Sequence, residues 1–183
     1  MFTSEVTEIA KMVNFMSALA IAFTILFMFW TITSLAKKMI KNTGELSSSS
    51  SIAILGSGIV GALTYTFSDS FWFSAVEGEV YAMSSFFTAV VFWAALKWDE
   101  EYDLVGDSAN RWLLLIAYLV GLSIGVHMLN LLAIPAVVYI YYFKKHETST
   151  KGFIITGITS IVILGFIFFG LIPQIIKWLG IVE

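Results

Sequence analysis

Long apolar segments alternate with short polar ones along this chain, and most of the apolar segments approach the length of a membrane crossing. A helix of roughly 20 mostly apolar residues crosses a bilayer core about 30 Å thick. Because backbone polar groups inside a bilayer must pair within their own segment, we expect helices even where β-branched residues are frequent. The expected helices cover residues 13–36, 52–67, 80–96, 112–126, 129–143 and 152–172.

The apolar stretch from Trp112 to Phe143 is too long for one crossing. Gly125, His127 and Pro135 interrupt it, so the sequence predicts two short helices joined by a tight turn at His127. The whole pattern predicts an all-α, polytopic membrane protein with about six transmembrane helices. We expect residues 1–183 to form a single transmembrane domain.

Composition agrees with this class of protein. Hydrophobic residues make up 58% of the 183 positions and aromatic residues 16%, which is more than a soluble domain of this size can bury. We therefore expect membrane lipid as a partner and no nucleic acid. The chain has no cysteine, which excludes disulfide bonds and thiolate metal sites within it.

Basic residues are distributed unevenly between the two sides that six alternating helices create. Of the ten lysines and arginines, only Lys11 and Lys177 lie on the side opposite the other eight. Cytoplasmic loops are enriched in Lys and Arg. The basic loops are therefore expected to be cytoplasmic, and both termini, the acidic loop at residues 69–79 and the turn at His127 are expected on the outer face.

The residues before Lys11 lack the basic region and the adjoining apolar region of a signal peptide. The predicted topology nevertheless places this end of the chain outside. We therefore expect an upstream helix, which would make the chain part of a longer protein.

Three carboxylates, Asp69, Glu77 and Glu79, stand between two expected helices with no Lys or Arg beside them. Because Glu77 and Glu79 are two residues apart, an extended loop can direct both into one space. Such a pair can hold a divalent cation such as Mg²⁺ or Mn²⁺ through oxygen ligands, or one carboxylate can act as a general base. The alternative is a solvated pair that caps the helix expected to begin at Val80.

His127 and Asn130 lie at the turn, on the same expected side as the acidic pair. Polar side chains at membrane depth usually face a cavity or a partner helix. They are therefore candidates to line one outer cavity together with Glu77 and Glu79. A hydrogen bond between helices is the alternative for both.

Glycines in the second apolar segment match the spacing of a dinucleotide-binding fingerprint, at Gly56, Gly58 and Gly61. That fingerprint requires a strand followed by a soluble helix, whereas this segment continues as an apolar crossing. Small residues at helical spacing let membrane helices approach closely. We expect this packing role here and at Gly121 and Gly125.

Two polar segments on the basic side have structural interpretations. The serine-rich loop at residues 37–51 predicts a flexible linker. The charged run at residues 97–103 contains several carboxylates, and we expect it to form a solvated surface rather than a metal site.

Two segments of the chain resemble a known family. They are Phe-Trp-Phe-Ser-Ala-Val-Glu-Gly-Glu-Val-Tyr-Ala at residues 71–82 and Gly-Leu-Ser-Ile-Gly-Val-His-Met-Leu-Asn-Leu-Leu-Ala-Ile-Pro at residues 121–135. Both are similar to segments of polytopic membrane proteins described as protein O-mannosyltransferase-like, in the GT-C glycosyltransferase superfamily. The resemblance extends from Val13 to Phe169. Family members have an additional first helix and a first outer loop with an acidic motif, which nothing before Lys11 matches.

The resemblance implies a GT-C-like fold and transfer of a sugar such as mannose from a polyprenyl-phosphate donor to a protein hydroxyl, on the outer face of a bacterial inner membrane. It also implies that Glu77 and Glu79 position metal, donor phosphate or acceptor, and that His127 and Asn130 line the same cavity. The principal catalytic base would belong to the first outer loop, so this chain alone would be inactive.

Two other functions remain open. In a transporter or channel, the carboxylates and His127 would form a path for protons or cations, but such proteins place polar groups near the midplane of several helices. The expected helix interiors here contain almost no ionisable residues. A non-catalytic scaffold subunit of a larger membrane complex fits the small residues and the abundant aromatic residues.

Overall fold

The computed structural model describes residues 6–41 and 47–180, and within these ranges every regular element is helical. Four of the described helical runs are long and apolar enough to cross a membrane: Thr7–Ile40, Ser48–Thr66, Val80–Ile124 and Thr150–Trp178. The predicted all-α membrane protein is therefore confirmed. The count of six crossings stays a prediction, since α5 (Arg111–Ile124) and α6 (Ala133–Lys145) are each only about 20 Å long.

The chain divides into two compact units, Met1–Asn130 and Leu131–Glu183. The first unit contains α1 (Val6–Lys41), α2 (Ser48–Thr66), α3 (Asp69–Val76), α4 (Val80–Val105), the 3-10 helix η1 (Gly106–Asn110), α5 and the start of the 3-10 helix η2 (Met128–Leu132). The second contains α6, α7 (Thr150–Gly165), the π-helix η3 (Phe166–Leu171) and α8 (Ile172–Leu179). That residues 1–183 act as one transmembrane domain stays a prediction.

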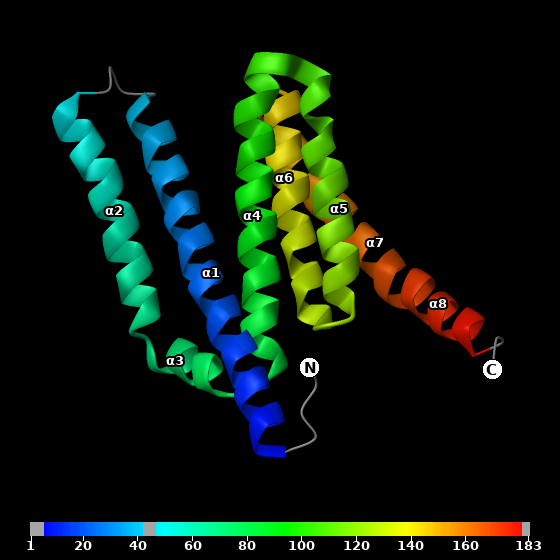
Figure 1. Cartoon of the computed structure of the whole chain (residues 1–183). Helices are drawn as coiled ribbons and strands as arrows, with labels where there is room; N and C mark the ends of the chain where they lie inside the picture. The colour runs from blue at the N-terminus through cyan, green and yellow to red at the C-terminus, as the bar shows by residue number, and fades with distance from the viewer. Residues whose placement is uncertain (1–5, 42–46, 181–183) are drawn as a thin grey trace. The chain divides into compact units, whose positions relative to one another are not determined.

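In the first unit, α1 packs against α2, α3 and α4, and α5 runs back along α4 (Figure 1). Aromatic rings fill the contact between α1 and α4. The ring centroid of Phe27 lies 5.1 Å from that of Trp93 and 6.0 Å from that of Phe86, and both pairs meet edge to face. Because lipid gives helices little hydrophobic drive to associate, such close packing holds them together.

Glycines bring α2 close to α1. A Cβ atom added at Gly58 would lie 2.5 Å from Thr33 Cγ2, and one added at Gly61 would lie 2.6 Å from Ile32 Cδ1. The expected packing role is therefore confirmed at these two positions. At Gly56 and Gly121 an added Cβ would meet no atom of the described chain within 4 Å, so the expectation is wrong there.

The serine run begins α2 instead of forming a linker. Ser47 is the N-cap, and its hydroxyl accepts a hydrogen bond from the backbone N–H of Ser50 at 3.2 Å. Serine is a favoured N-cap because it satisfies one of the helix's unpaired amides. The linker prediction is thus wrong for residues 37–41, which belong to α1, and for residues 48–51, while its residues 42–46 lie outside the described ranges.

In the second unit, α6 packs against α7, and α7, η3 and α8 form one continuous helical run. The Tyr139 hydroxyl of α6 donates to the Phe153 carbonyl of α7 at 3.1 Å. The run widens into a π-helix just before Pro173. Proline has no N–H, and its ring crowds the carbonyl four residues earlier, at Phe169, so a local change of helix type is the expected response.

Replacing Gly58 by Ala is expected to destabilise the first unit by about 1–3 kcal/mol, because the added methyl overlaps the Thr33 methyl and the Phe29 ring. Thr33 is β-branched and its hydroxyl donates to the Phe29 carbonyl at 3.0 Å, so its methyl cannot move aside without losing that bond. Thermal unfolding in detergent measures the effect.

The matched control is Gly56→Ala on the same helix. Its Cβ meets open space within the described chain, and alanine is the better helix former by about 0.5–1 kcal/mol. Equal unfolding midpoints for Gly58→Ala and Gly56→Ala would contradict the close α1–α2 contact.

Candidate functional site

The acidic pair forms the connection between α3 and α4. Glu77 is the C-cap of α3, with φ −96° and ψ 138°, and Glu79 is the N-cap of α4, with φ −113° and ψ 167°. Both residues are exposed. Their exposure agrees with the alternative of a solvated pair, although the side chain of the N-cap residue Glu79 makes no capping hydrogen bond. The backbone is therefore extended on each side of Gly78, which leaves both carboxylates available to a ligand.

Helix α1 fixes the position of this connection. A Cβ at Gly78 would lie 2.7 Å from Val13 Cγ1 and 3.2 Å from Asn14 Oδ1, so only glycine fits without a shift. On the preceding helix, Phe71 is 4% exposed. It belongs to a buried cluster with Ala20, Ile21 and Ala82. The acidic pair is thus held on a packed base rather than on a free loop.

His127 lies at the end of α4 that begins with the acidic pair. Its ring contacts Tyr81 in the first turn of α4, with centroids 5.6 Å apart. Its Nδ1 accepts a hydrogen bond from the backbone N–H of Leu129 at 3.1 Å, which orients the ring. A neutral imidazole that accepts at Nδ1 carries its proton on Nε2, so Nε2 is the donor that His127 can offer to a ligand.

Asn130 lies deeper along α4 than the acidic pair. It is 5% exposed, and its Oδ1 accepts hydrogen bonds from the hydroxyls of Ser84 at 2.5 Å and Thr88 at 3.2 Å. These two hydroxyls are one helical turn apart and share a face of α4. Asn130 therefore forms hydrogen bonds to a neighbouring helix, which was the alternative to a role in a ligand site. Its Nδ2 has no hydrogen-bond partner in the described chain.

The structure tests how these residues fit a metal ion. Among the described residues, no three or more His, Asp or Glu side chains are grouped as metal ligands. Mg²⁺ is commonly held by one or two carboxylates together with waters and substrate phosphates. Glu77 and Glu79 can meet that requirement only in company with substrate oxygens.

The charged run at residues 97–103 forms the opposite end of α4. Asp99 pairs with Lys38 of α1 and is 9% exposed. Glu101 accepts hydrogen bonds from Arg111 and from the Trp112 indole. The expected solvated surface is therefore wrong for Asp99, because the sequence does not reveal that a lysine of another helix lies against it.

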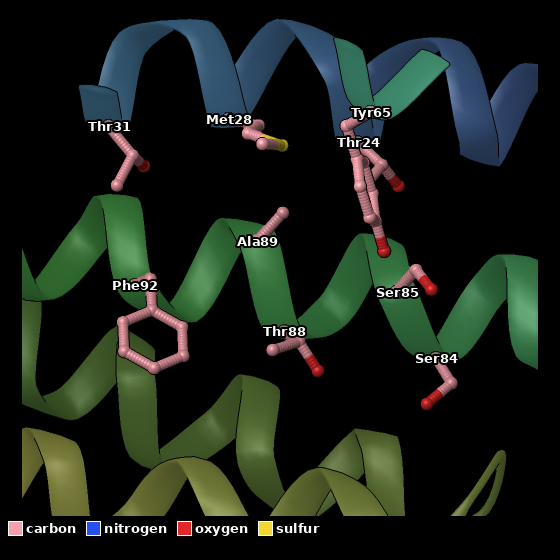
Figure 2. A pocket seen from close by; sticks show the side chains of 9 residues that line it. All are labelled: Thr24, Met28, Thr31, Tyr65, Ser84, Ser85, Thr88, Ala89 and Phe92. Atoms are coloured by element: carbon pink, nitrogen blue, oxygen red, sulfur yellow. The ribbon is translucent and has the colours of Figure 1, made fainter. Parts of the chain in front are cut away.

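A cavity of about 340 Å³, which the sequence did not predict, lies between α1, α2 and α4. Figure 2 shows the side chains that line it. It is lined by Thr24, Met28, Thr31, Tyr65, Ser84, Ser85, Thr88, Ala89 and Phe92. The hydroxyl residues of its wall recur at helical spacing within apolar segments. That recurrence was the feature of the sequence that could have predicted the cavity.

Comparison with known proteins gives one match. The family model described as the protein O-mannosyl-transferase TMEM260 N-terminal domain matches residues 1–150. The matched range includes Glu77, Glu79, His127 and Asn130, and it confirms the family resemblance of segments 71–82 and 121–135. No curated protein and no solved structure shows significant similarity to the chain.

Asn130→Ala is expected to lower the free energy of unfolding by about 1–2 kcal/mol, because two partly buried hydroxyls lose their acceptor. The loss is limited because Ser84 and Thr88 can turn to backbone carbonyls one helical turn earlier. Ser84→Ala removes one of the two donors and should cost less. Thermal unfolding of both variants measures the difference, and a wild-type midpoint for Asn130→Ala would refute the structural role.

Proposed function

Because this chain belongs to the family of the protein O-mannosyl-transferase TMEM260 N-terminal domain, we propose that it is the membrane part of an enzyme that transfers mannose from a polyprenyl-phosphate carrier to protein hydroxyl groups. The family supports a glycosyltransferase role in general terms. The sugar, the lipid carrier and the acceptor belong to the proposal. The observation that carries the proposal is that the family match covers the connection between α3 and α4. In that connection Glu77 and Glu79 flank Gly78, at the same end of α4 as His127.

The geometry suits a lipid-linked donor. The phosphate of such a donor lies near the membrane surface, so a transferase needs exposed polar groups at the ends of its helices. Glu77 and Glu79 are exposed where α3 ends and α4 begins, and His127 contacts the first turn of α4. A site with these groups can bind polar parts of the donor while its hydrocarbon chain stays in the bilayer.

In the proposed reaction, the acceptor hydroxyl oxygen bonds to the anomeric carbon of the sugar, and the bond from that carbon to the phosphate oxygen breaks. The hydroxyl proton passes to a base, and the polyprenyl phosphate leaves with the electron pair. We assign positioning roles to this chain. His127 Nε2–H donates a hydrogen bond to the sugar-carrying substrate, and the two carboxylates orient the acceptor hydroxyl. If a divalent cation takes part, Glu77 and Glu79 would hold it.

We propose that such a cation supplies positive charge for the phosphate. At this end of α1 the described chain offers Lys11, whose Nζ lies 3.1 Å from Glu8 Oε1 and is therefore partly neutralised. A divalent cation held by Glu77 and Glu79 would add positive charge at this end of α4.

We also propose that the end of α4 carrying Glu79 faces outward and that the basic loops are cytoplasmic, as in a bacterial inner membrane. The uneven distribution of Lys and Arg supports this orientation. The chain has no cysteine, so single introduced cysteines report the topology without background.

Ser70→Cys and Ser49→Cys test the orientation, since both serines are exposed. Ser49 lies in the first turn of α2, and Ser70 lies in the first turn of α3, beyond the other end of α2. A membrane-impermeant maleimide is expected to label Ser70→Cys in intact cells. Ser49→Cys should be labelled only after permeabilisation. The reverse pattern would reject the proposed orientation.

Glu77→Gln and Glu79→Gln are expected to lower sugar transfer by about tenfold or more, because a misplaced donor or acceptor loses the geometry of attack. The assay uses membranes that contain either the unmodified protein or a variant. It measures the transfer of labelled mannose from a polyprenyl-phosphate donor to a peptide that contains serine and threonine. Amounts in the membrane are matched by immunoblot.

Asp69→Asn is the charge-matched control, because Asp69 is an exposed carboxylate of the same region in the first turn of α3. Transfer should be retained in this variant. Unchanged transfer in both glutamate variants would exclude them from the site and would favour a scaffold role for the chain.

A further inference from the structure

The cavity between α1, α2 and α4 is independent of the proposed outer site. It lies within the first unit, and its wall combines six hydroxyl side chains with three apolar ones (Figure 2). Thr24 stands in the middle of the membrane-crossing run Thr7–Ile40, and Thr31 lies about two helical turns further along it. The cavity therefore reaches well into the depth of the bilayer, below the level of Glu77 and Glu79.

Three of its hydroxyls have no hydrogen-bond partner among the described residues. Thr31 Oγ1 is buried without a hydrogen bond. Within the described part of the chain, the hydroxyls of Tyr65 and Ser85 form no hydrogen bond either. Figure 2 shows the Tyr65 ring extending from α2 toward the turn of α4 that carries Ser85. These three groups come from three different helices and border one space.

The other hydroxyls of the cavity wall, in contrast, all form hydrogen bonds within the protein. Thr24 donates to the Ala20 carbonyl at 2.7 Å, which is the ordinary way for a threonine in a membrane helix to satisfy itself. Ser84 and Thr88 donate to Asn130. A polar group that stays unpaired in an apolar medium is costly. The buried, unpaired hydroxyl of Thr31, together with the more accessible hydroxyls of Tyr65 and Ser85 on the same space, indicates a ligand that hydrogen-bonds to them.

The composition of the wall restricts the chemistry of that ligand. No residue that lines the cavity is a Lys, Arg, His, Asp or Glu, so a phosphate placed there would have no counter-charge. Met28, Ala89 and Phe92 are apolar and offer nothing to a cluster of water molecules. A pocket with an apolar wall and a few placed hydroxyls suits an uncharged amphiphile.

We infer that this cavity binds an uncharged lipid that carries a free hydroxyl group. The lipid hydroxyl bonds to Tyr65, Ser85 or Thr31, and the adjoining hydrocarbon contacts Met28, Ala89 and Phe92. Diacylglycerols and long-chain prenols share this chemistry. The inference does not depend on the proposed transfer reaction, because it rests on a different space and different residues.

Photocrosslinking of the purified chain in nanodiscs tests the inference. Diazirine-bearing diacylglycerol, diazirine-bearing long-chain prenol and diazirine-bearing phosphatidylcholine are each included at the same mole fraction, and crosslinked peptides are mapped by mass spectrometry. At least one alcohol is expected to label the cavity-lining turns of α1 or α4, and an excess of the same unlabelled alcohol should suppress it. Which alcohol labels identifies the source.

Labelling by phosphatidylcholine to the same extent would mean ordinary surrounding lipid and would overturn the inference. Absence of labelling by both alcohols would also overturn it. Either result leaves the proposed transfer reaction untouched, so the two failures are distinguishable.

Variants place the binding in the cavity. Ala89→Phe should reduce crosslinking about tenfold by filling the space, and Ser85→Ala should reduce it about fivefold by removing one hydrogen bond. The matched controls are Ala22→Phe, at an exposed position of α1, and Ser57→Ala, whose exposed hydroxyl bonds to the Ile54 carbonyl. Thermal unfolding confirms that each variant is folded. Crosslinking unchanged in Ser85→Ala and Ala89→Phe would reject the site.

Discussion

The packing of α4 against α1 is the contact on which the rest of the first unit depends. At one end, Gly78 lets the start of α4 approach α1 at Val13 and Asn14. In the middle, Phe27 meets Trp93 and Phe86 edge to face. At the other end, Lys38 of α1 pairs with the buried Asp99 of α4. Three kinds of interaction, steric, aromatic and ionic, thus fix one pair of helices along its length.

This contact positions both regions to which we assign ligands. The acidic connection is held in place by two contacts with α1. Phe71, which precedes the connection, packs against α1, and Gly78 inside the connection lies directly against α1. The hydroxyl-lined cavity exists because the same two helices leave a space beside Thr24 and Ser85 that α2 borders with Tyr65. A change that loosened α1 from α4 would therefore disturb both.

Polar groups at membrane depth divide into two kinds. Thr24 is satisfied within its own helix, whereas Ser84 and Thr88 bond to the Asn130 carbonyl oxygen and join α4 to the turn that carries Asn130. Among the described residues, Thr31 Oγ1 and Asn130 Nδ2 are buried without a hydrogen-bond partner. Leaving a buried polar group unpaired costs about 1–3 kcal/mol, so the satisfied groups are explained by structure, and the unpaired hydroxyl that borders the cavity calls for a ligand.

The sequence by itself determined that the chain is helical and lies in a membrane, because the solvent imposes both. Apolar runs of this length have no other stable environment, and a bilayer forces their backbones to pair locally. It also supplied the family through segments 71–82 and 121–135, and it indicated Glu77, Glu79 and His127 as neighbours on one side. The shared end of α4 in the structure agrees with that placement.

Only the tertiary structure decided which helices touch. Hydrophobic patterning cannot specify this in a membrane, because a residue that faces lipid and one that faces another helix both meet apolar surroundings. Lys38 with Asp99, Asn130 with Ser84, and Gly58 with Thr33 are pairs far apart in the chain. The ion pair at Asp99, the structural role of Asn130 and the cavity all arise from such pairs. Their energy depends on three-dimensional proximity rather than on local sequence.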